Sequence, residues 1–377
     1  MSQSDVIVVG AGIAGASVAA HLAKTRRVVL IEGEERPGYH STGRSAALFT
    51  EIYGNSLIRS LTRGSRGFLF GPPPAFAEVP LARPRGCLYI ATADQSAALK
   101  DFANQPDIRP ATRPMSADEA RRLCPVLREE YVVEALYEPA SADIEVHSLH
   151  QGYLRWFRSR SGTLLTSAPV HGIERTNEAW TVRAGMDTLS APILINAAGA
   201  WADEIAALAG IARIGLVPCR RTAVLVDPPP EMAIGAWPFV SDIDDRFYFK
   251  PEAGRLFLSP ADETPTVAGD AQPDEWDVAV AVERVEAATT LKIDRPTARW
   301  AGLRTFAPDR SPVVGFSEEA AGFFWLAGQG GYGIQTAPAL SRVAAALALG
   351  LPLPSDLVDT GVNAAEISPS RFAPRAR

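Results

Sequence analysis

The sequence contains little cysteine. Of its 377 residues, only Cys87, Cys124 and Cys219 are cysteines, and no two of them form a CxxC pair. Disulfide-stabilised folds need more cysteines at closer spacing, so a disulfide framework is not expected. The low number fits a protein of a reducing compartment.

The sequence also lacks an excess of positive charge and a long uninterrupted apolar run. Lys and Arg number 37 and Asp and Glu number 43, which gives a formal net charge of -6. The net charge therefore does not favour binding to nucleic acid or to an anionic membrane. No run reaches the roughly 18 apolar residues of a spanning helix, and the basic cluster near the N-terminus follows the apolar stretch 6–23 instead of preceding it as in a signal sequence. We expect a cytoplasmic protein with small-molecule partners, with peripheral membrane association left open. The oligomeric state is not indicated.

The composition of the chain is typical of a globular protein, and its length is sufficient for two domains. Hydrophobic residues make up 47% and charged residues 21%. A chain of 377 residues exceeds the size at which a single core stops growing. Two domains, contiguous or interleaved, are therefore expected.

The pattern of apolar residues predicts an interleaved α/β arrangement. β-branched runs at 5–9 and 27–31 flank a helical stretch, and strand, glycine turn and helix recur near the C-terminus. Short runs separated by Pro, Asp and Gly lie between them, as in an antiparallel sheet. The prediction is a Rossmann-like nucleotide-binding domain from residues 1–80, 145–212 and 298–377. Residues 81–144 and 213–297 form an interleaved substrate domain with a mixed or antiparallel β-sheet.

A glycine-rich turn follows the first predicted strand and opens the first predicted helix. It reads GAGIAG, with Gly10, Gly12 and Gly15 at the positions of G-x-G-x-x-G. The first glycine permits a tight turn, the second lets a pyrophosphate approach the backbone, and the third allows the helix to pack on the strand. Glu32 ends the second strand, where an acid can bind ribose hydroxyls. The turn predicts dinucleotide binding without choosing between NAD and FAD.

Three further segments identify a family. The loop PGYHSTGRS at 37–45, NAAGAW at 196–201 and QGGYGIQ at 329–335 resemble the D-amino acid oxidase superfamily of FAD-dependent oxidoreductases over nearly the whole chain. More closely, residues 38–53 and the late GGYGIQT resemble bacterial FAD-dependent D-amino acid dehydrogenases of the D-arginine dehydrogenase type. The resemblance implies FAD as cofactor.

The resemblance also indicates how FAD is held. Relatives that attach the flavin through cysteine carry that cysteine just before the Pro-Asp of a strand that here reads LRTFAPD, without cysteine, so FAD is expected to be noncovalent. The residues expected to contact FAD are Gly10, Gly12, Ala14, Gly15, Glu32, Gly33, Ser41, Thr42, Gly43, Arg44, Ser45, Ala47, Leu48, Val170, Ala198, Gly199, Trp201, Gly330, Gly331, Tyr332, Gly333, Ile334, Gln335 and Thr336.

The substrate side is predicted around Arg304. A planar guanidinium can donate two parallel hydrogen bonds to a carboxylate, and in the family an arginine on this strand pairs with the substrate carboxylate. Tyr248 alternates with two phenylalanines and could bind the same carboxylate. The resemblance adds Tyr53 as a pocket or lid residue and Arg221 as a polar contact. Because neighbours on a strand point in opposite directions, only one of Arg220 and Arg221 can line the pocket.

The predicted pocket is more apolar than in the closest type. Leu48, Cys87, Gly331, Tyr332 and Gln335 are its expected walls. Relatives that favour cationic substrates have an acid on the strand that contains Cys87, and the closest type has a histidine in place of Leu48. Neutral or hydrophobic D-amino acids are therefore expected over D-arginine or D-lysine.

The resemblance implies oxidative deamination of D-amino acids to 2-oxo acids and ammonia, by hydride transfer from Cα to flavin N5. One alternative is a related flavin enzyme that acts on glycine, sarcosine or another secondary amine. A second is a flavin-binding subunit that transfers electrons without its own substrate. Neither the electron acceptor, O2 or a quinone, nor a general base among the five histidines is indicated. The pair His147 and His150 lacks further ligands, so no metal site is expected.

Overall fold

The computed structural model describes residues 4–176 and 178–372. The half that contains the predicted nucleotide-binding turn is built on a six-stranded sheet. The strand order is β20-β21-β13-β1-β2-β9, and all neighbours are parallel except the pair β20 and β21. The strands are β1 (Val6–Val9), β2 (Val28–Ile31), β9 (Thr163–Leu165), β13 (Ile193–Asn196), β20 (Val313–Phe316) and β21 (Phe323–Ala327).

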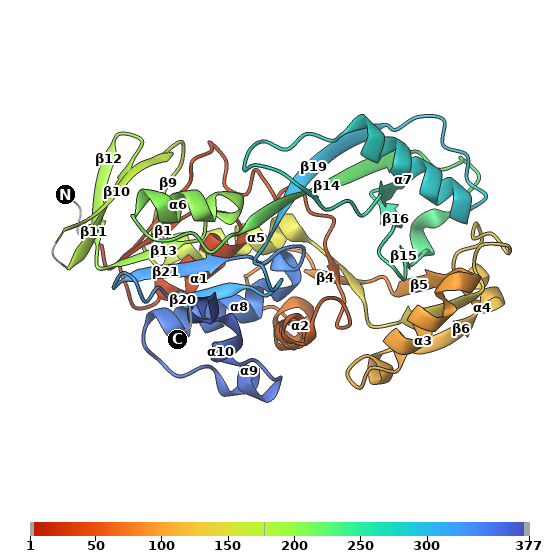
Figure 1. The fold of residues 1–377 in the computed structure, drawn as a ribbon, viewed down its shortest axis with the longest axis horizontal. Coiled ribbons are helices and arrows are strands. Elements are labelled where there is room, and N and C mark those ends of the chain that lie inside the picture. Colours follow the sequence, from red (N-terminus) through yellow and green to blue (C-terminus); the bar gives the residue numbers. More distant parts are fainter. Residues whose placement is uncertain (1–3, 177, 373–377) are drawn as a thin grey trace.

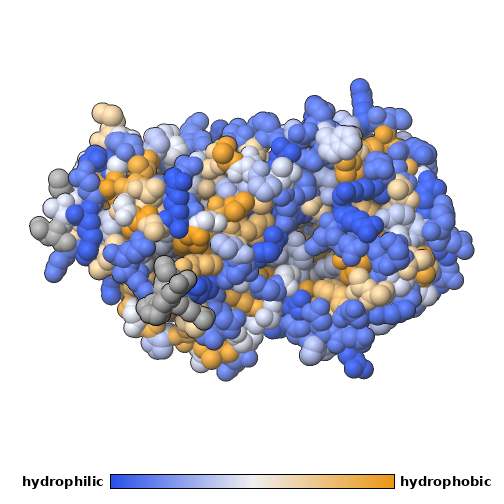
Figure 2. All heavy atoms as spheres, viewed as in Figure 1, coloured by the Kyte–Doolittle hydropathy of each residue, from blue (hydrophilic) through white to orange (hydrophobic). Residues whose placement is uncertain are grey.

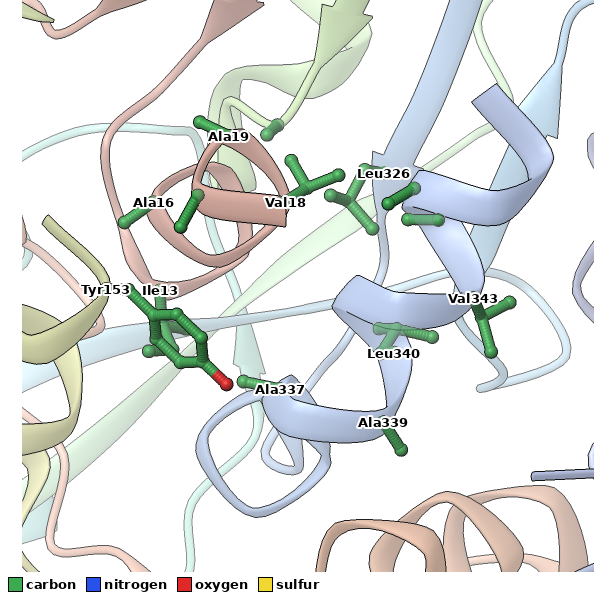
Figure 3. Packing of buried hydrophobic residues seen from close by; sticks show 14 of the residues in the cluster. Ile13, Ala16, Val18, Ala19, Tyr153, Leu326, Ala337, Ala339, Leu340 and Val343 are labelled. Carbon is green, nitrogen blue, oxygen red and sulfur yellow. The ribbon is translucent and has the colours of Figure 1, made fainter. Parts of the chain in front are cut away.

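Both faces of this sheet are covered, which is why its strands are continuous apolar runs. Along β1, Val6 and Val8 join one hydrophobic cluster, and Ile7 and Val9 join another on the opposite face. The first cluster is shared with the helices α1 (Ile13–Leu22), α2 (Ser56–Phe70), α5 (Val146–Ser159) and α8 (Gly333–Ala348). Figure 3 shows side chains of α1 and α8 meeting in this cluster beside Tyr153. The second cluster includes α6 (Ala202–Leu208) and the sheet β10 (Val170–Thr176), β11 (Ala179–Ala184) and β12 (Asp187–Ala191).

The other half contains a nine-stranded sheet (Figure 1). The order is β18-β14-β17-β16-β15-β5-β7-β6, with β19 also paired to β14, and the pairs are antiparallel except β15 with β5. Its strands are β5 (Cys87–Ala91), β6 (Arg113–Ser116), β7 (Glu134–Glu138), β14 (Val217–Val226), β15 (Phe239–Asp242), β16 (Tyr248–Glu252), β17 (Arg255–Ser259), β18 (Thr264–Pro265) and β19 (Ala298–Phe306). The helices of this half are α3 (Ser96–Ala103), α4 (Ala117–Leu123) and α7 (Glu275–Ala288).

Two long strands of this sheet, β14 and β19, extend toward the six-stranded sheet (Figure 1). They pair antiparallel from Val217 opposite Phe306 to Leu225 opposite Ala298. The strand 298–306 thus lies in the substrate-side sheet, although the sequence-based boundary placed it in the cofactor domain. Its alternating pattern predicts a strand but does not say which sheet it joins.

Smaller elements complete the chain. A three-stranded sheet joins β3 (Leu48–Phe49), β8 (Ala142–Ile144) and β4 (Ala82–Pro84), and the last helices are α9 (Ser355–Asp359) and α10 (Ala364–Ile367). Ser116 and Glu119 form a capping box at the start of α4. Figure 2 shows hydrophilic residues over most of one face, with hydrophobic ones scattered among them. Within the described residues, no helix has the length and apolar character that a membrane crossing requires.

Candidate active site

A cavity of about 470 Å³ lies where the two sheets meet. Its walls come from the turn between β1 and α1, the loop 38–46, the segment after β13, the strands β14, β16 and β19, and the turn before α8. Seventeen of the predicted FAD contacts line it, namely Gly10, Gly12, Ala14, Glu32, Gly33, Ser41, Thr42, Arg44, Ser45, Val170, Ala198, Gly199, Trp201, Gly330, Gly331, Gly333 and Ile334. Segments far apart in the sequence therefore share one concave site.

The three glycines of the first turn have different surroundings. Gly10 has a φ of +97°, and a Cβ there would lie 2.5 Å from the Ala197 oxygen. A Cβ on Gly15 would lie 1.8 Å from the Gly10 oxygen, so helix and strand can approach only without it. A Cβ on Gly12 would meet nothing within 4 Å except the Thr42 hydroxyl at 3.3 Å. Gly10 and Gly15 are required by the fold, whereas a Cβ on Gly12, which lines the cavity, would press on one side-chain atom only.

The loop after β2 is fixed to this turn. Glu32 accepts a hydrogen bond from the Ala11 N–H at 2.9 Å, and Thr42 accepts one from the Ile13 N–H at 3.0 Å. Ser41 donates to the Leu303 carbonyl at 2.6 Å, so the same loop also contacts β19. The loop therefore joins the glycine turn to the strand that contains Arg304.

Several buried polar atoms in the cavity wall have no partner within the described residues. They are His40 Nδ1, Gln329 Nε2 and Arg221 Nε. Buried polar atoms without partners are rare in folded proteins unless a ligand or water binds them. Together with the missing side chain at Gly12, they fit a large polar ligand such as a dinucleotide. His40 and Gln329 belong to the motifs that identify the family, but their type alone gave no reason to select them.

Arg304 lies at the substrate end of the cavity, between two tyrosines. Its Nη1 donates to the Tyr53 hydroxyl at 3.3 Å, and its Nη2 is 3.5 Å from the Tyr248 hydroxyl. Both contacts are long for hydrogen bonds. Across residues 4–176 and 178–372, no carboxylate forms an ion pair with Arg304. A partly buried cation without a counter-ion favours an anionic ligand.

The tyrosines respond to this charge in opposite ways. Burial would raise the pKa of Tyr248, but the charges of Arg304 and Arg221 outweigh it, and the pKa is lowered. Burial dominates at Tyr53 and raises its pKa. Burial alone would lower the pKa of Arg304, and the two neighbouring tyrosines instead raise it. Arg304 therefore stays cationic throughout the range in which proteins are stable.

The neighbouring arginines of β14 point in opposite directions, as the alternation predicts. Arg221 lines the cavity and pairs with Glu263 at 3.0 Å. Arg220 pairs with Asp277 at 2.7 Å and is not part of the cavity wall. The pairing of Arg221 with a carboxylate distinguishes it from Arg304.

A second cavity, of about 290 Å³, lies beside Arg304. Tyr53 and Tyr332 line it, with ring centroids 5.0 Å apart, and further walls come from Tyr89, Phe102, Asp245 and Arg310. Burial raises the pKa of Asp245. Tyr332, predicted as a wall of the main site, faces this second cavity.

Seven predicted residues line neither cavity: Gly15, Gly43, Ala47, Leu48, Cys87, Gln335 and Thr336. Leu48 and Cys87 pack in a hydrophobic cluster, and burial raises the pKa of the Cys87 thiol well above its usual value. Gln335 accepts a hydrogen bond from the Thr50 N–H and donates one to Thr62. The pocket roles of Leu48, Cys87 and Gln335 therefore stay predictions, and in this structure their side chains pack in the protein interior or bond to neighbouring residues.

Comparison with protein families shows to which family the chain belongs. The family model described as FAD dependent oxidoreductase, the DAO family, matches residues 5–347. The chain belongs to this family. This confirms FAD as cofactor and the predicted α/β fold class.

The individual relatives have low sequence identity to this chain. Rat mitochondrial dimethylglycine dehydrogenase is 24% identical over 96% of this chain, which spans 45% of that protein. The glycine oxidase of Geobacillus kaustophilus is 24% identical, over 97% of this chain and 95% of the relative. The structure of L-proline dehydrogenase from P. horikoshii has a TM-score of 0.82, at 22% identity, over 98% of both chains. These relatives do not single out the D-arginine dehydrogenase type, so the finer resemblance is not confirmed.

Proposed function

We propose that this FAD-dependent oxidoreductase oxidises the amine of a small amino acid of the glycine, sarcosine (N-methylglycine) or N,N-dimethylglycine class. The observation that carries the proposal is Arg304, a cavity-lining guanidinium without a carboxylate partner among the described residues. A substrate carboxylate would supply its counter-ion. This favours an amino acid over an amine that has no acid group.

The relatives support the amine class. Those that match along the whole chain include a glycine oxidase, and those that match it as part of a longer protein include dimethylglycine dehydrogenase and 4-methylaminobutanoate oxidase. All three names describe an amine next to a short carbon chain that ends in a carboxylate. The chain covers about half the length of the dimethylglycine dehydrogenases, so their full activity is not transferred to it.

The residues divide into two groups by role. The glycine turn, Glu32, the loop 41–45 and the turn before α8 would hold FAD, and the N-terminus of α8 would place its positive dipole end against negative charge. When bound, FAD supplies the two-electron acceptor that takes a hydride from the carbon next to the amine, leaving an imine that water hydrolyses. Arg304, Tyr248 and Tyr53 would fix the carboxylate and thereby orient that carbon.

The test is anaerobic bleaching of the bound flavin by a panel of substrates. Glycine, sarcosine and dimethylglycine should bleach it, and the D- and L-forms of larger amino acids should do so more slowly. Admission of air then shows whether O2 restores the colour or another acceptor, such as a quinone, is needed. Bleaching by larger amino acids alone would contradict the proposal.

A second candidate is oxidation of neutral or hydrophobic D-amino acids. The cavity of about 290 Å³ beside Arg304 favours it, because four aromatic rings line a space that glycine would leave empty. An apolar side chain could occupy that space while the carboxylate binds Arg304. Faster bleaching by D-phenylalanine than by sarcosine or L-phenylalanine would select this candidate.

A further inference from the structure

Three arginines meet at the substrate end of the site. Arg221 lines the main cavity, Arg310 lines the second cavity, and Arg304 lies beside Tyr53, which also lines the second. The charges of Arg304 and Arg310 both act on Tyr332 between them. Such a cluster is suited to more than one carboxylate.

A single carboxylate of the protein pairs with two of these arginines. One Glu263 oxygen accepts from Arg221 Nη2 at 3.0 Å, and both oxygens accept from Arg310 Nη2, at 3.0 and 2.9 Å. Its charge also acts on Arg304, although the two side chains form no ion pair. Glu263, which lines neither cavity, therefore already engages the two guanidinium groups to which a second ligand carboxylate could bind.

The backbone holds Glu263 in this position. The preceding residue, Asp262, accepts hydrogen bonds from the Thr222 N–H at 2.6 Å and from its hydroxyl at 3.0 Å. Thr222 is in β14 directly after Arg221, so the loop is fixed to the strand that presents the arginine. Arg221 is only 9% exposed and its Nε has no partner within the described residues, so Glu263 does not use every donor of this guanidinium.

We propose that Glu263 is a specificity-determining residue that restricts the site to substrates with one carboxylate, an inference that rests on the proposed function. It pairs with Arg221 and Arg310, so that within the described residues Arg304 is the one arginine of the three without a carboxylate partner. A dicarboxylate substrate would bring a second negative charge against the Glu263 carboxylate. Loss of that carboxylate would free two arginines for the second acid group.

The experiment compares sarcosine with iminodiacetate, two secondary amines that differ by one carboxylate. The measured quantity is the ratio of kcat/KM for iminodiacetate to that for sarcosine. Glu263→Gln should raise this ratio at least tenfold, and Glu263→Asp, which keeps the charge, should change it much less. The matched control is Glu174→Gln, which removes an exposed carboxylate paired with Arg183 in the sheet β10–β12. An unchanged or lower ratio in a folded Glu263→Gln variant with bound FAD would overturn the proposal.

A binding measurement on the wild-type holoenzyme covers the case in which Glu263→Gln does not fold. Acetate and malonate serve as unreactive probes, followed by the shift in flavin absorbance. The wild-type protein should bind acetate at least tenfold more tightly than malonate, and equal or tighter binding of malonate would refute the role of Glu263. If neither amine is oxidised by the wild type, the proposed function fails, and the two titrations still decide the role of Glu263.

Discussion

At the scale of single residues, Arg304 was predictable in part. In the sequence, the arginine side chain and its apolar neighbours indicated a residue that binds a substrate carboxylate. The absence of a counter-ion among the described residues could not be predicted, because it depends on where Glu263 and Asp245 lie in space. Sequence spacing does not give either position, since Asp245 follows β15 and Glu263 follows β17, whereas Arg304 is on β19. The pocket roles of Cys87 and Leu48 stay predictions.

Arg304→Met should lower kcat/KM more than a hundredfold while FAD remains bound. The change removes two charge-assisted hydrogen bonds, a loss of about 3 kcal/mol. Steady-state kinetics and the flavin absorbance of the purified variant measure both properties. Arg299→Met is the matched control, because Arg299 is exposed on the same strand and pairs with Glu275. Equal losses in the two variants would refute a substrate contact at Arg304.

Gly12→Ala should weaken FAD binding with little loss of protein stability. The added methyl group would lie 3.3 Å from the Thr42 hydroxyl, a tight contact with one movable side chain, on the side where the backbone must approach a pyrophosphate. FAD titration of the apoprotein and its thermal unfolding measure the two effects. Gly67→Ala, on the exposed side of α2 with nothing within 4 Å, is the control. Unchanged FAD affinity would remove Gly12 from the predicted contacts.

At the scale of elements, apolar periodicity predicted most helices and strands to within a few residues. The β-branched runs at 5–9 and 27–31 are observed as the strands Val6–Val9 and Val28–Ile31. The partners of the strands were less predictable. β19 joins β14 instead of the six-stranded sheet, because pairing depends on contacts between segments distant in the sequence.

The helix α1 makes stability depend on pH through His21. This side chain packs near Tyr153 and Trp156 of α5, and burial lowers its pKa from 6.5 to about 3. Below pH 6.5 the unfolded chain therefore binds a proton at His21 that the folded chain does not. The contribution of His21 to the free energy of unfolding is thus fully present above pH 6.5 and is lost as the pH falls toward 3. At pH 5 the loss is about 2 kcal/mol.

Denaturant unfolding at pH 7 and pH 5 measures this effect. His21→Gln should lose less stability between the two values than the wild type. His171→Gln, on the exposed face of β10, should behave like the wild type. Equal pH dependence in all three proteins would show that His21 is not the group responsible.

At the scale of the whole molecule, the site depends on segments from both halves. The loop after β2 is bonded to β19 through Ser41 and Leu303, and Arg44 forms an ion pair with Asp270 and donates to the Ala301 carbonyl at 2.9 Å. The sequence motifs predicted that these segments meet at a cofactor, because each motif belongs to the same family. The contacts that Ser41 and Arg44 make between the two halves depend on the tertiary structure, which the sequence motifs do not describe.

Removal of FAD should therefore destabilise the whole protein. A ligand that binds the folded state at a hundred times its Kd adds about 2.7 kcal/mol to the free energy of unfolding. Thermal unfolding should show a lower Tm for the apoprotein, and the Tm should rise with the FAD concentration. Limited proteolysis of the apoprotein should cut first in the loop 38–46, which contacts the cavity along its length. A Tm independent of FAD would contradict this coupling.

The central claim is that Arg304 binds the carboxylate of an amine substrate. The most direct test is the rate of anaerobic flavin bleaching by sarcosine and by dimethylamine, which share a secondary methylamine but differ in the carboxylate. The account predicts that sarcosine bleaches the flavin of the wild type and that dimethylamine does so at least a hundredfold more slowly, with the difference largely lost in Arg304→Met. Equal bleaching rates for the two amines in the wild type would contradict it.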